Sequence, residues 1–263
     1  MSDGHFAGAL LDLDGTVYLG DQLLPGADGA VTSLRDGGVS VLFLTNKAIE
    51  RRETYCRKLT ELGVPADEED VITSGAMTAQ YLATHHPSDP VFVVGEEPLE
   101  RELEAAGLEL TDTPEAAGVL LASMDRRFDY ERLSAARRAV EAASTFIATN
   151  PDRTCPTETG EIPDCAAMVG AIEGASGREL ERVIGKPSQT AIDASMDRLG
   201  LAPEQCLIVG DRLETDIEMG NRAGMTTVLV LTGVTDRRTV AASSIQPDHV
   251  IDSVADLGSV VGA

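Results

Sequence analysis

The feature that most limits the fold of this chain is a regular alternation of short apolar runs with segments of helical periodicity. The apolar runs are typical of buried strands and cover Gly8–Leu13, Val39–Leu44, Val91–Val94, Val119–Ala122, Thr145–Ala148, Cys206–Val209 and Thr227–Leu231. Hydrophobic residues recur about every 3.6 positions between them, in Ala27–Asp36, Ile49–Leu62, Ala76–Thr84, Leu99–Ala106, Tyr130–Ala143 and Thr190–Leu199. Apolar strands that alternate with helices are covered on both faces. The pattern predicts an α/β fold with a Rossmann-like, doubly wound parallel sheet.

Length and composition limit the number of domains and the location of the protein. With 263 residues and 43% hydrophobic content, the chain can form one large or two modest globular domains. No apolar run approaches the roughly 20 residues of a membrane-spanning helix. The N-terminal residues MSDGHFAG lack a basic region followed by a long apolar stretch, so no secretory signal is predicted. We therefore expect a cytoplasmic protein.

The chain is strongly acidic, with a formal net charge of −23 and a sequence pI of about 4.4. Its field repels nucleic acids and anionic membrane surfaces, so neither is expected as a partner. The only lysines among its 21 basic residues are Lys47, Lys58 and Lys186. An acidic surface with so few lysines resembles that of halophilic proteins, which work in a salt-rich cytoplasm, and favours a role in solvation. A surface that binds a basic partner is the alternative.

The four cysteines show no pattern of metal binding. They form no CxxC pair and have no histidine nearby in the sequence, and they are Cys56, Cys155, Cys165 and Cys206. We expect reduced, inert thiols and no zinc site.

Polar residues follow several of the predicted strands at the points where these end. They are Asp12 and Asp14 in "DLDGT", Thr45 and Asn46 in "LTN", Lys186 in "IGKPS", and Asp211 and Asp216 in "GDRLETD". Because the carboxyl ends of parallel strands lie at one edge of a sheet, we expect these side chains to converge. For Asp14 the alternative is a structural role, as the cap of a following element.

The chemistry of this set favours phosphoryl transfer. Clustered carboxylates suit a hard cation such as Mg²⁺, and an aspartate can act as a nucleophile that forms an aspartyl-phosphate. Mg²⁺, the Lys186 ammonium and the Thr45 hydroxyl could neutralise the phosphoryl oxygens in the transition state. No GxG sequence occurs in the chain, which excludes a Rossmann dinucleotide fingerprint.

The motifs DLDGT, TN, GKP and GDRLETD, in this order, resemble those of the haloacid dehalogenase (HAD) superfamily, over essentially the whole chain. Within it the chain looks most like the group of NagD, 4-nitrophenylphosphatase and AraL-type sugar phosphatases, on the residues Pro25-Gly26, Val93–Glu96 and Ile147–Asp152. The resemblance implies a Mg²⁺-dependent phosphatase. Its substrates would be small phosphomonoesters such as sugar phosphates, nucleotide monophosphates or aryl phosphates.

The resemblance also implies a role for each motif residue. Asp12 would be the nucleophile, and Asp14 the general acid for the leaving group and then the base for water. Mg²⁺ would be held by Asp12, the Asp14 backbone carbonyl and Asp211, with support from Asp216. The phosphoryl group would be bound by Thr45, Asn46 and Lys186.

The spacing of the motifs indicates where a second domain is inserted. Only about 30 residues separate Asp14 from Thr45, whereas about 140 separate Asn46 from Lys186. In the group that the chain resembles, such an insertion is a smaller α/β cap of the C2 type. We expect a core at residues 1–84 and 181–263 and a cap at residues 85–180. The turn-rich segments His86–Pro90 and Gly174–Arg182 would be the seams.

The cap offers candidates for substrate contact. Asn150 and Asp152 follow a predicted cap strand, and the segment Ile162–Met168 is expected to be a loop near the substrate. An Asx turn around Pro151 is the alternative reading of Asn150 and Asp152. Caps of this kind often pack on one another, which leaves open a homo-oligomer formed through the caps.

The chain departs from the group after Thr45-Asn46, where a short run rich in serine and arginine is common. Here the sequence is Lys47-Ala48-Ile49-Glu50. Lys47 is expected either to replace a contact at the entrance of the site or to belong to a plain helix N-terminus.

Three other activities suit the same fold. A carbon–halogen hydrolase would use the Asp12 nucleophile, but it would not need a carboxylic acid at Asp14, because a halide leaves without a proton. A phosphotransferase would pass the phosphoryl group to a sugar instead of water. A non-catalytic binding module is the least expected, because all motif residues are present.

Overall fold

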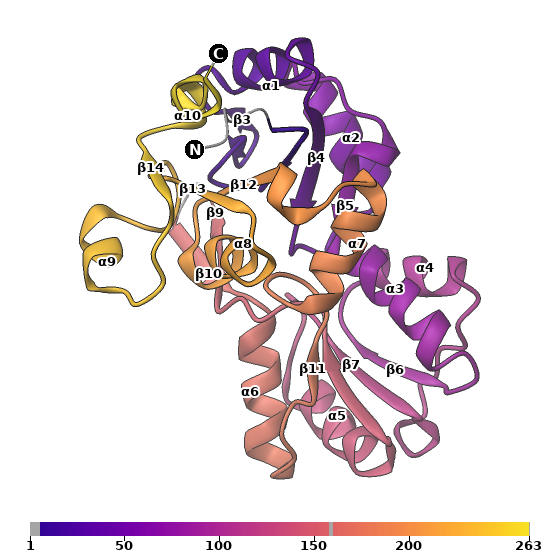
Figure 1. The fold of residues 1–263 in the computed structure, drawn as a ribbon. Helices are drawn as coiled ribbons and strands as arrows, with labels where there is room; N and C mark the ends of the chain where they lie inside the picture. Colours follow the sequence, from indigo (N-terminus) through magenta and orange to yellow (C-terminus); the bar gives the residue numbers. More distant parts are fainter. Residues whose placement is uncertain (1–5, 158–159, 263) are drawn as a thin grey trace.

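The first apolar run forms strand β1 (Gly8–Leu11) near the middle of a six-stranded parallel sheet (Figure 1). The computed structural model describes residues 6–157 and 160–262. The sheet has the order β14-β13-β12-β1-β4-β5, and the other strands are β4 (Ser40–Thr45), β5 (Val71–Thr73), β12 (Cys206–Gly210), β13 (Thr226–Val230) and β14 (His249–Ile251). Leu10 pairs with Ile208 on one side and with Leu42 on the other. Segments nearly 200 residues apart in sequence are therefore neighbours at the centre of the sheet.

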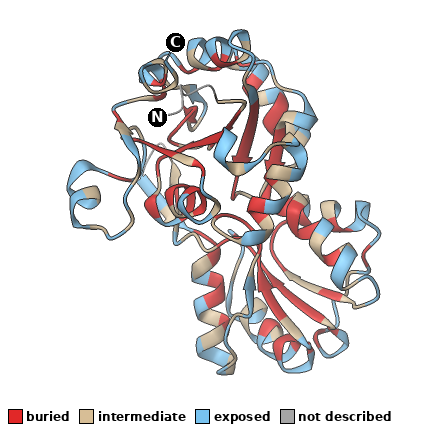
Figure 2. Cartoon of the chain, in the orientation of Figure 1, coloured by how far each residue is buried: buried red, intermediate tan, exposed pale blue. Residues whose placement is uncertain are grey.

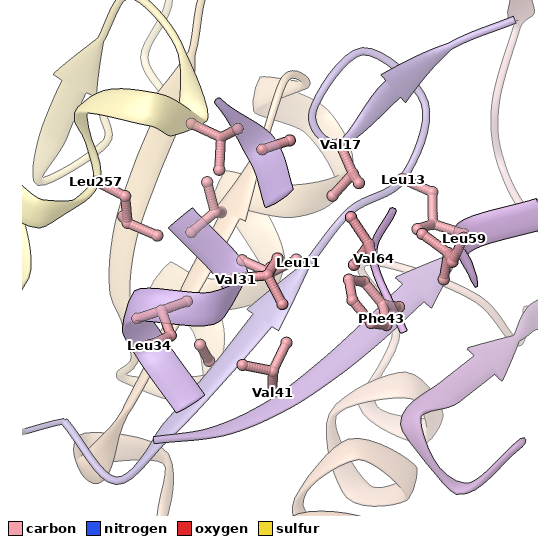
Figure 3. Close-up of a cluster of buried hydrophobic side chains, with 14 of the residues drawn as sticks. Leu11, Leu13, Val17, Val31, Leu34, Val41, Phe43, Leu59, Val64 and Leu257 are labelled. Atoms are coloured by element: carbon pink, nitrogen blue, oxygen red, sulfur yellow. The ribbon is translucent and has the colours of Figure 1, made fainter. Parts of the chain in front are cut away.

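Alternation along the strands divides the core between the two faces of this sheet. Ala9 and Leu11 of β1 belong to one buried cluster, whereas Leu10 belongs to another. Figure 3 shows the first cluster, in which Leu11 and Phe43 lie among side chains from the covering helices. These helices and those elsewhere around the sheet are α1 (Ala27–Asp36), α2 (Arg52–Glu61), α3 (Ser74–His85), α7 (Gln189–Leu199), α8 (Glu218–Ala223), α9 (Arg237–Ala242) and α10 (Gly258–Val261). The strands are buried while the outer helix surfaces are exposed (Figure 2).

A second, four-stranded parallel sheet lies below the first in Figure 1. Its order is β11-β8-β7-β6, with strands β6 (Val91–Val94), β7 (Val119–Ala122), β8 (Thr145–Ala148) and β11 (Arg182–Val183). It carries helices α4 (Glu97–Ala105), α5 (Tyr130–Ala142) and α6 (Cys165–Ser176). β11 pairs with β8. The smaller sheet therefore includes Arg182 and Val183, which the predicted boundary assigns to the core segment 181–263.

Two hairpins complete the fold. A short antiparallel pair, β2 (Tyr18–Leu19) and β3 (Gln22–Leu23), follows the first motif. A longer pair, β9 (Thr154–Thr157) and β10 (Gly160–Pro163), leads from β8 into α6. In the described part of the chain, no helix combines the length and apolar character needed to cross a membrane.

The sequence-based prediction of a loop at Ile162–Met168 is wrong. This segment holds the end of β10 and the first turn of α6, and α6 runs on into the predicted seam at Gly174–Arg182. The helix reads CAAMVGAIEGAS, and its two glycines lower its helix propensity, whereas its four alanines raise it. It forms because Asp164 caps its N-terminus and a stripe that includes Met168 and Ile172 is buried against the smaller sheet.

Candidate active site

The predicted residues converge around one buried ammonium group. Lys186 is 2% exposed, and it lies in the loop between β11 and α7. Its Nζ donates to Asp12 Oδ1 at 2.5 Å, to Asp216 Oδ1 at 2.6 Å and to the Leu44 carbonyl oxygen at 3.1 Å. Acceptors from β4, from the end of β1 and from the helical turn after β12 therefore share one cation, as parallel topology predicts.

The charges of this cluster shift the pKa values of its members in opposite senses. Burial raises the pKa of Asp12 well above its ordinary value; Lys186 opposes that shift, while Asp216 and Asp211 add to it. Burial alone would lower the pKa of Lys186, but Asp12 and Asp216 raise it above its ordinary value. Lys186 is therefore a permanent cation. It balances only part of the negative charge of the three carboxylates around it.

The remaining negative charge fits a divalent cation. Asp12, Asp211 and Asp216 each offer one carboxylate oxygen, and these oxygens lie within 4.8 Å of one another. Burial, followed by the charge of Asp216, raises the pKa of Asp211 to about 7. Hard carboxylate oxygens are the donors that Mg²⁺ prefers. The donor set therefore suits a hard divalent cation.

Close approach of the backbone holds Asp211 in place. The Val234 amide donates to Asp211 Oδ2 at 2.7 Å. A Cβ on Gly233 would lie 1.9 Å from that oxygen, and one on Gly15, whose φ is 82°, would lie 2.8 Å from it. Only glycine leaves room at Gly233, and Gly15 also has a left-handed conformation that disfavours a side chain. The glycine in "DLDGT" thus allows the left-handed turn and also leaves space for the Asp211 carboxylate.

Asn46 connects two loops of the site. Its Nδ2 donates to the Lys186 carbonyl at 3.1 Å, and the Lys186 amide donates to Asn46 Oδ1 at 2.8 Å. The preceding Thr45 accepts a hydrogen bond from the Lys47 amide at its Oγ1, at 3.1 Å, and lies at the pocket wall. The Asn46 amide is therefore engaged in holding Lys186, whereas the Thr45 hydroxyl can still donate.

Lys47 forms an ion pair with Asp14, and both residues line the pocket. Its Nζ donates to Asp14 Oδ1 at 2.7 Å, and no described residue forms a hydrogen bond with the buried Oδ2 of Asp14. Burial alone would lower the pKa of Lys47, but the charge of Asp14 raises it. Helix α2 begins only at Arg52, so Lys47 belongs to the site loop and not to the helix.

These groups line one pocket between the two sheets. The larger sheet and its loops contribute Asp12, Asp14, Thr45, Asn46, Lys47, Lys186, Arg212, Thr215 and Asp216. The connection from β8 to α6, which includes the β9–β10 hairpin, contributes Asp152, Thr154, Cys155, Pro156 and Asp164. Asp211 lies behind this surface, 1% exposed.

The structure separates the two predicted cap residues. Asn150 is 1% exposed and donates from Nδ2 to the Asn46 carbonyl at 2.9 Å, while its Oδ1 accepts from the Asp152 amide at 3.0 Å. It forms the Asx turn that was the alternative reading, and it joins the smaller sheet to the larger one. Asp152 does line the pocket. Burial raises its pKa, and the guanidinium of Arg212 opposes that shift.

Sequence reasoning missed Arg212, and it covered Asp164 only as part of the segment Ile162–Met168, which it expected near the substrate; Asp164 does line the pocket. Arg212 donates from Nη2 to the Thr154 carbonyl at 2.7 Å, and its amide donates to Asp216 Oδ2 at 3.1 Å, so it links the hairpin to the carboxylate cluster. Its position directly after Asp211 in "GDRLETD" could have indicated that Arg212 lies at the site. Asp164 is the N-cap residue of α6. Because this helix was not predicted from the sequence, the capping role of Asp164 could not be predicted either.

Comparison with known proteins agrees with this geometry. Residues 9–109 and 183–257 match two families described as haloacid dehalogenase-like hydrolases. Sugar-phosphatase AraL of Bacillus subtilis is 38% identical over 95% of this chain and 92% of its own length. 5'-Nucleotidase YutF of the same organism is 36% identical over 95% and 97%.

Solved structures show the same fold. The crystal structure of 4-nitrophenylphosphatase from Thermotoga maritima superposes with a TM-score of 0.92 at 32% identity, covering 98% of each chain. NagD from Escherichia coli K-12 superposes with a TM-score of 0.86 at 30% identity, covering 96% of this chain and 98% of its own. These matches confirm the resemblance inferred from the four motifs, and this chain belongs to the haloacid dehalogenase-like hydrolases.

Proposed function

We propose that this chain is a phosphatase that hydrolyses small phosphomonoesters through an aspartyl-phosphate at Asp12. The observation that carries the proposal is the position of Lys186, which contacts Asp12 and Asp216 beside a pocket that also holds Asp14. An anionic phosphoryl group needs a nucleophile, a cation and a proton donor within reach of one another. The names of the relatives, which include sugar, nucleotide and nitrophenyl phosphatases, support the same activity.

The reaction would proceed in two steps. In the first, an oxygen of Asp12 bonds to phosphorus as the bond to the leaving oxygen breaks, and Asp14 gives that oxygen a proton. In the second, Asp14 takes a proton from water, the water oxygen bonds to the same phosphorus, and the Asp12–phosphorus bond breaks to release phosphate. Lys186 and the Thr45 hydroxyl would hold the phosphoryl oxygens throughout.

We also propose Mg²⁺ as the cofactor. Asp12, Asp211 and the Asp14 backbone carbonyl would hold the ion, with Asp216 in support. When bound, it would neutralise negative charge on the phosphoryl group. The chain's own contribution is to orient these oxygens, through the Val234 amide at Asp211 and the Arg212 amide at Asp216.

The division of labour between domains is part of the proposal. The core at residues 1–84 and 181–263 would carry the chemistry, and the cap at residues 85–180 would contact the leaving group. The acidic composition supports a salt-rich cytoplasm as the working environment.

Release of inorganic phosphate from a panel of phosphomonoesters, with Mg²⁺ and in molar KCl, tests the function. Asp12→Asn should abolish release while the circular dichroism spectrum stays unchanged, and Asp236→Asn, which changes an exposed helix cap, is the matched control. EDTA should stop the wild-type reaction and Mg²⁺ should restore it. Turnover of Asp12→Asn within tenfold of wild type would contradict the covalent route.

The same assay separates the rival activities. Release of halide from 2-haloacids without release of phosphate would indicate a carbon–halogen hydrolase. Transfer of ³²P to an added sugar in preference to water would indicate a phosphotransferase. The position of Asp14 beside Asp12, within the pocket, favours hydrolysis of an ester whose leaving oxygen needs a proton.

A further inference from the structure

One of the two lysines in the pocket has no part in the proposed reaction. The chain has three lysines, of which Lys186 holds the nucleophile and Lys58 forms an ion pair at the surface. Lys47 lines the pocket, and its side chain is 19% exposed. It also stands where the sequence departs from the group that the chain resembles. A buried charge is costly unless it is paired, so the partner of Lys47 indicates its role.

That partner is the carboxylate of Asp14. Lys47 Nζ donates to Asp14 Oδ1 at 2.7 Å, and no other group in the described part of the chain forms an ion pair or a hydrogen bond with this carboxylate. The second oxygen of Asp14, Oδ2, is buried and has no hydrogen-bond partner among the described residues. Lys47 therefore makes the two oxygens of Asp14 different.

The backbone of the loop after β4 determines where the Lys47 side chain starts. The Lys47 amide donates to Thr45 Oγ1 at 3.1 Å, and helix α2 begins only at Arg52. Strands β1 and β4 are neighbours in the sheet, and Asp14 follows β1 as Lys47 follows β4. The ion pair thus joins two adjacent loops at the edge of the sheet where the site lies.

This pairing decides which oxygen of Asp14 can carry a proton to the substrate. An ammonium group has three donors and no acceptor, so the oxygen that faces Lys47 accepts a hydrogen bond and is a poor place for the proton. The proton that Asp14 gives to the leaving oxygen then lies on Oδ2. It leaves Oδ2 as the bond from phosphorus to the leaving oxygen breaks. In the second step Oδ2 takes a proton from the attacking water.

A direct contact of Lys47 with the phosphoryl group fits the geometry less well. Lys186 already contacts the nucleophile Asp12 at 2.5 Å, whereas Lys47 is held by Asp14. To bind the phosphoryl group, Lys47 would have to leave Asp14, whose side chain is 12% exposed. Asp14 would then be a mostly buried carboxylate without a partner, which is unfavourable.

We propose that Lys47 is a positioning residue for Asp14: it holds Oδ1, so that Oδ2 is the oxygen that exchanges a proton with the leaving group and with water. The inference rests on the proposed phosphatase function. Misplacement of a reacting group by about 1 Å can lower a rate about 10²-fold. The loss of Lys47 should therefore slow the reaction only where Asp14 has a proton to give.

A double-mutant cycle with two esters tests the proposal. Lys47→Met, Asp14→Asn and the variant with both substitutions are compared with the wild type, with Mg²⁺ and in molar KCl. The substrates are glycerol 1-phosphate and 4-nitrophenyl phosphate, and the measured quantity is kcat/KM, which includes the cleavage of the ester.

The expected losses differ between the two esters. For glycerol 1-phosphate, Lys47→Met should lower kcat/KM about 30-fold when Asp14 is present and less than about twofold in the Asp14→Asn background. For 4-nitrophenyl phosphate, whose leaving oxygen needs no proton, Lys47→Met should cost less than about threefold in either background.

Lys58→Met is the matched control, because Lys58 is the lysine outside the pocket. It should leave kcat/KM for both esters within about twofold of wild type, as expected for a surface substitution. Circular dichroism checks that each variant is folded. If Lys47→Met is not folded, Lys47→Gln takes its place in the cycle, because it removes the charge and keeps a polar side chain of nearly the same length.

The outcomes separate this inference from the proposed function. An equal loss in both backgrounds, or for both esters, would overturn the positioning role, since Lys47 would then act on the phosphoryl group or on the fold. Hydrolysis of only the nitrophenyl ester by the wild type would also overturn it, because Asp14 would then give no proton. Both results leave the phosphatase function standing. Absence of phosphate release from either ester would overturn the function as well.

Discussion

At the scale of single residues, the site depends on how few cations balance many carboxylates. Lys186 serves Asp12 and Asp216 together, and Lys47 serves Asp14. Each ammonium is paired at short range, so neither can be removed without leaving a buried negative charge.

Lys186→Met should lose nearly all activity and, in EDTA at pH 7.5, lower the free energy of unfolding by about 3–5 kcal/mol, because Asp12 and Asp216 lose their buried partner. Urea denaturation measures the stability. Lys58→Met is the control, since Lys58 pairs with Asp21, whose side chain is 90% exposed, and such pairs are worth at most about 1 kcal/mol. Equal destabilisation by the two substitutions would refute the central role of Lys186.

Asp14→Asn should harm hydrolysis most where the leaving group is most basic. A nitrophenolate leaves without a proton, whereas an alkoxide needs one, and general acid catalysis contributes roughly 10²–10⁴-fold. The kcat values of the variant and wild type over a series of aryl and alkyl phosphates provide the measurement. Asp152→Ala, on the other side of the pocket, should instead change substrate preference independently of leaving-group pKa. A constant loss across the series for Asp14→Asn would assign it a structural role.

At the scale of elements, the site is built where two sets of parallel strands end. β1, β4 and β12 lead into the catalytic candidates, while the β8–α6 connection brings Asp152 and Asp164 from the other side. Helix α6 thus has two functions, because the carboxylate that caps it also lines the pocket. A buried cap with a raised pKa makes stability depend on pH.

Asp164→Asn should become more stable relative to wild type as pH rises from 4 to 7. The pKa of Asp164 in the folded protein is about 6, above its ordinary value of 3.8. Its contribution to stability is therefore fully present below about pH 4 and is lost as pH rises through 6. The difference in unfolding free energy between variant and wild type should shift by about 2 kcal/mol in favour of the variant. Asparagine also caps helices well, so the cap itself is retained.

Chemical denaturation at pH 4, 5.5 and 7 measures this shift. Asp129→Asn, at the exposed cap of α5, should show a smaller change across the same range. A flat difference for Asp164→Asn would mean that its carboxyl group is not desolvated in the folded protein.

At the scale of the whole molecule, the net charge of −23 dominates behaviour in solution. Self-repulsion destabilises a compact state, and salt screens it over a Debye length that falls from about 10 Å at 0.1 M to about 3 Å at 1 M. Pairs inside the pocket are screened much less, because they are buried. Salt should therefore stabilise the fold more than it changes the chemistry.

Raising KCl from 0.1 to 2 M should raise Tm by about 5 °C, which corresponds to roughly 2 kcal/mol for a chain of this size. Differential scanning calorimetry measures the change. Sucrose at matched osmolality is the control for preferential exclusion, which also stabilises compact states. An equal rise in sucrose would show that charge screening is not the cause.

The fold class could be predicted from the amino-acid sequence alone, and so could the convergence of the motif residues at one edge of the sheet. The apolar runs Val91–Val94 and Val119–Ala122 form strands with the bounds that the sequence predicts. Asp12, Thr45 and Asp211 follow such strands, and parallel topology alone brings strand ends together. These predictions did not require any interatomic distance, because the hydrophobic periodicity of the chain indicates where each strand ends.

Which residues of the β8–α6 connection line the pocket could not be predicted before the segments had packed. Asn150 and Asp152 are two positions apart, yet one joins the two sheets and the other lines the pocket. Arg212 and Thr154 belong to different parts of the chain, yet the Arg212 Nη2 donates to the Thr154 carbonyl at 2.7 Å and both residues line the pocket. A local pattern encodes burial and periodicity, whereas a hydrogen bond between distant segments exists only after these segments have packed together.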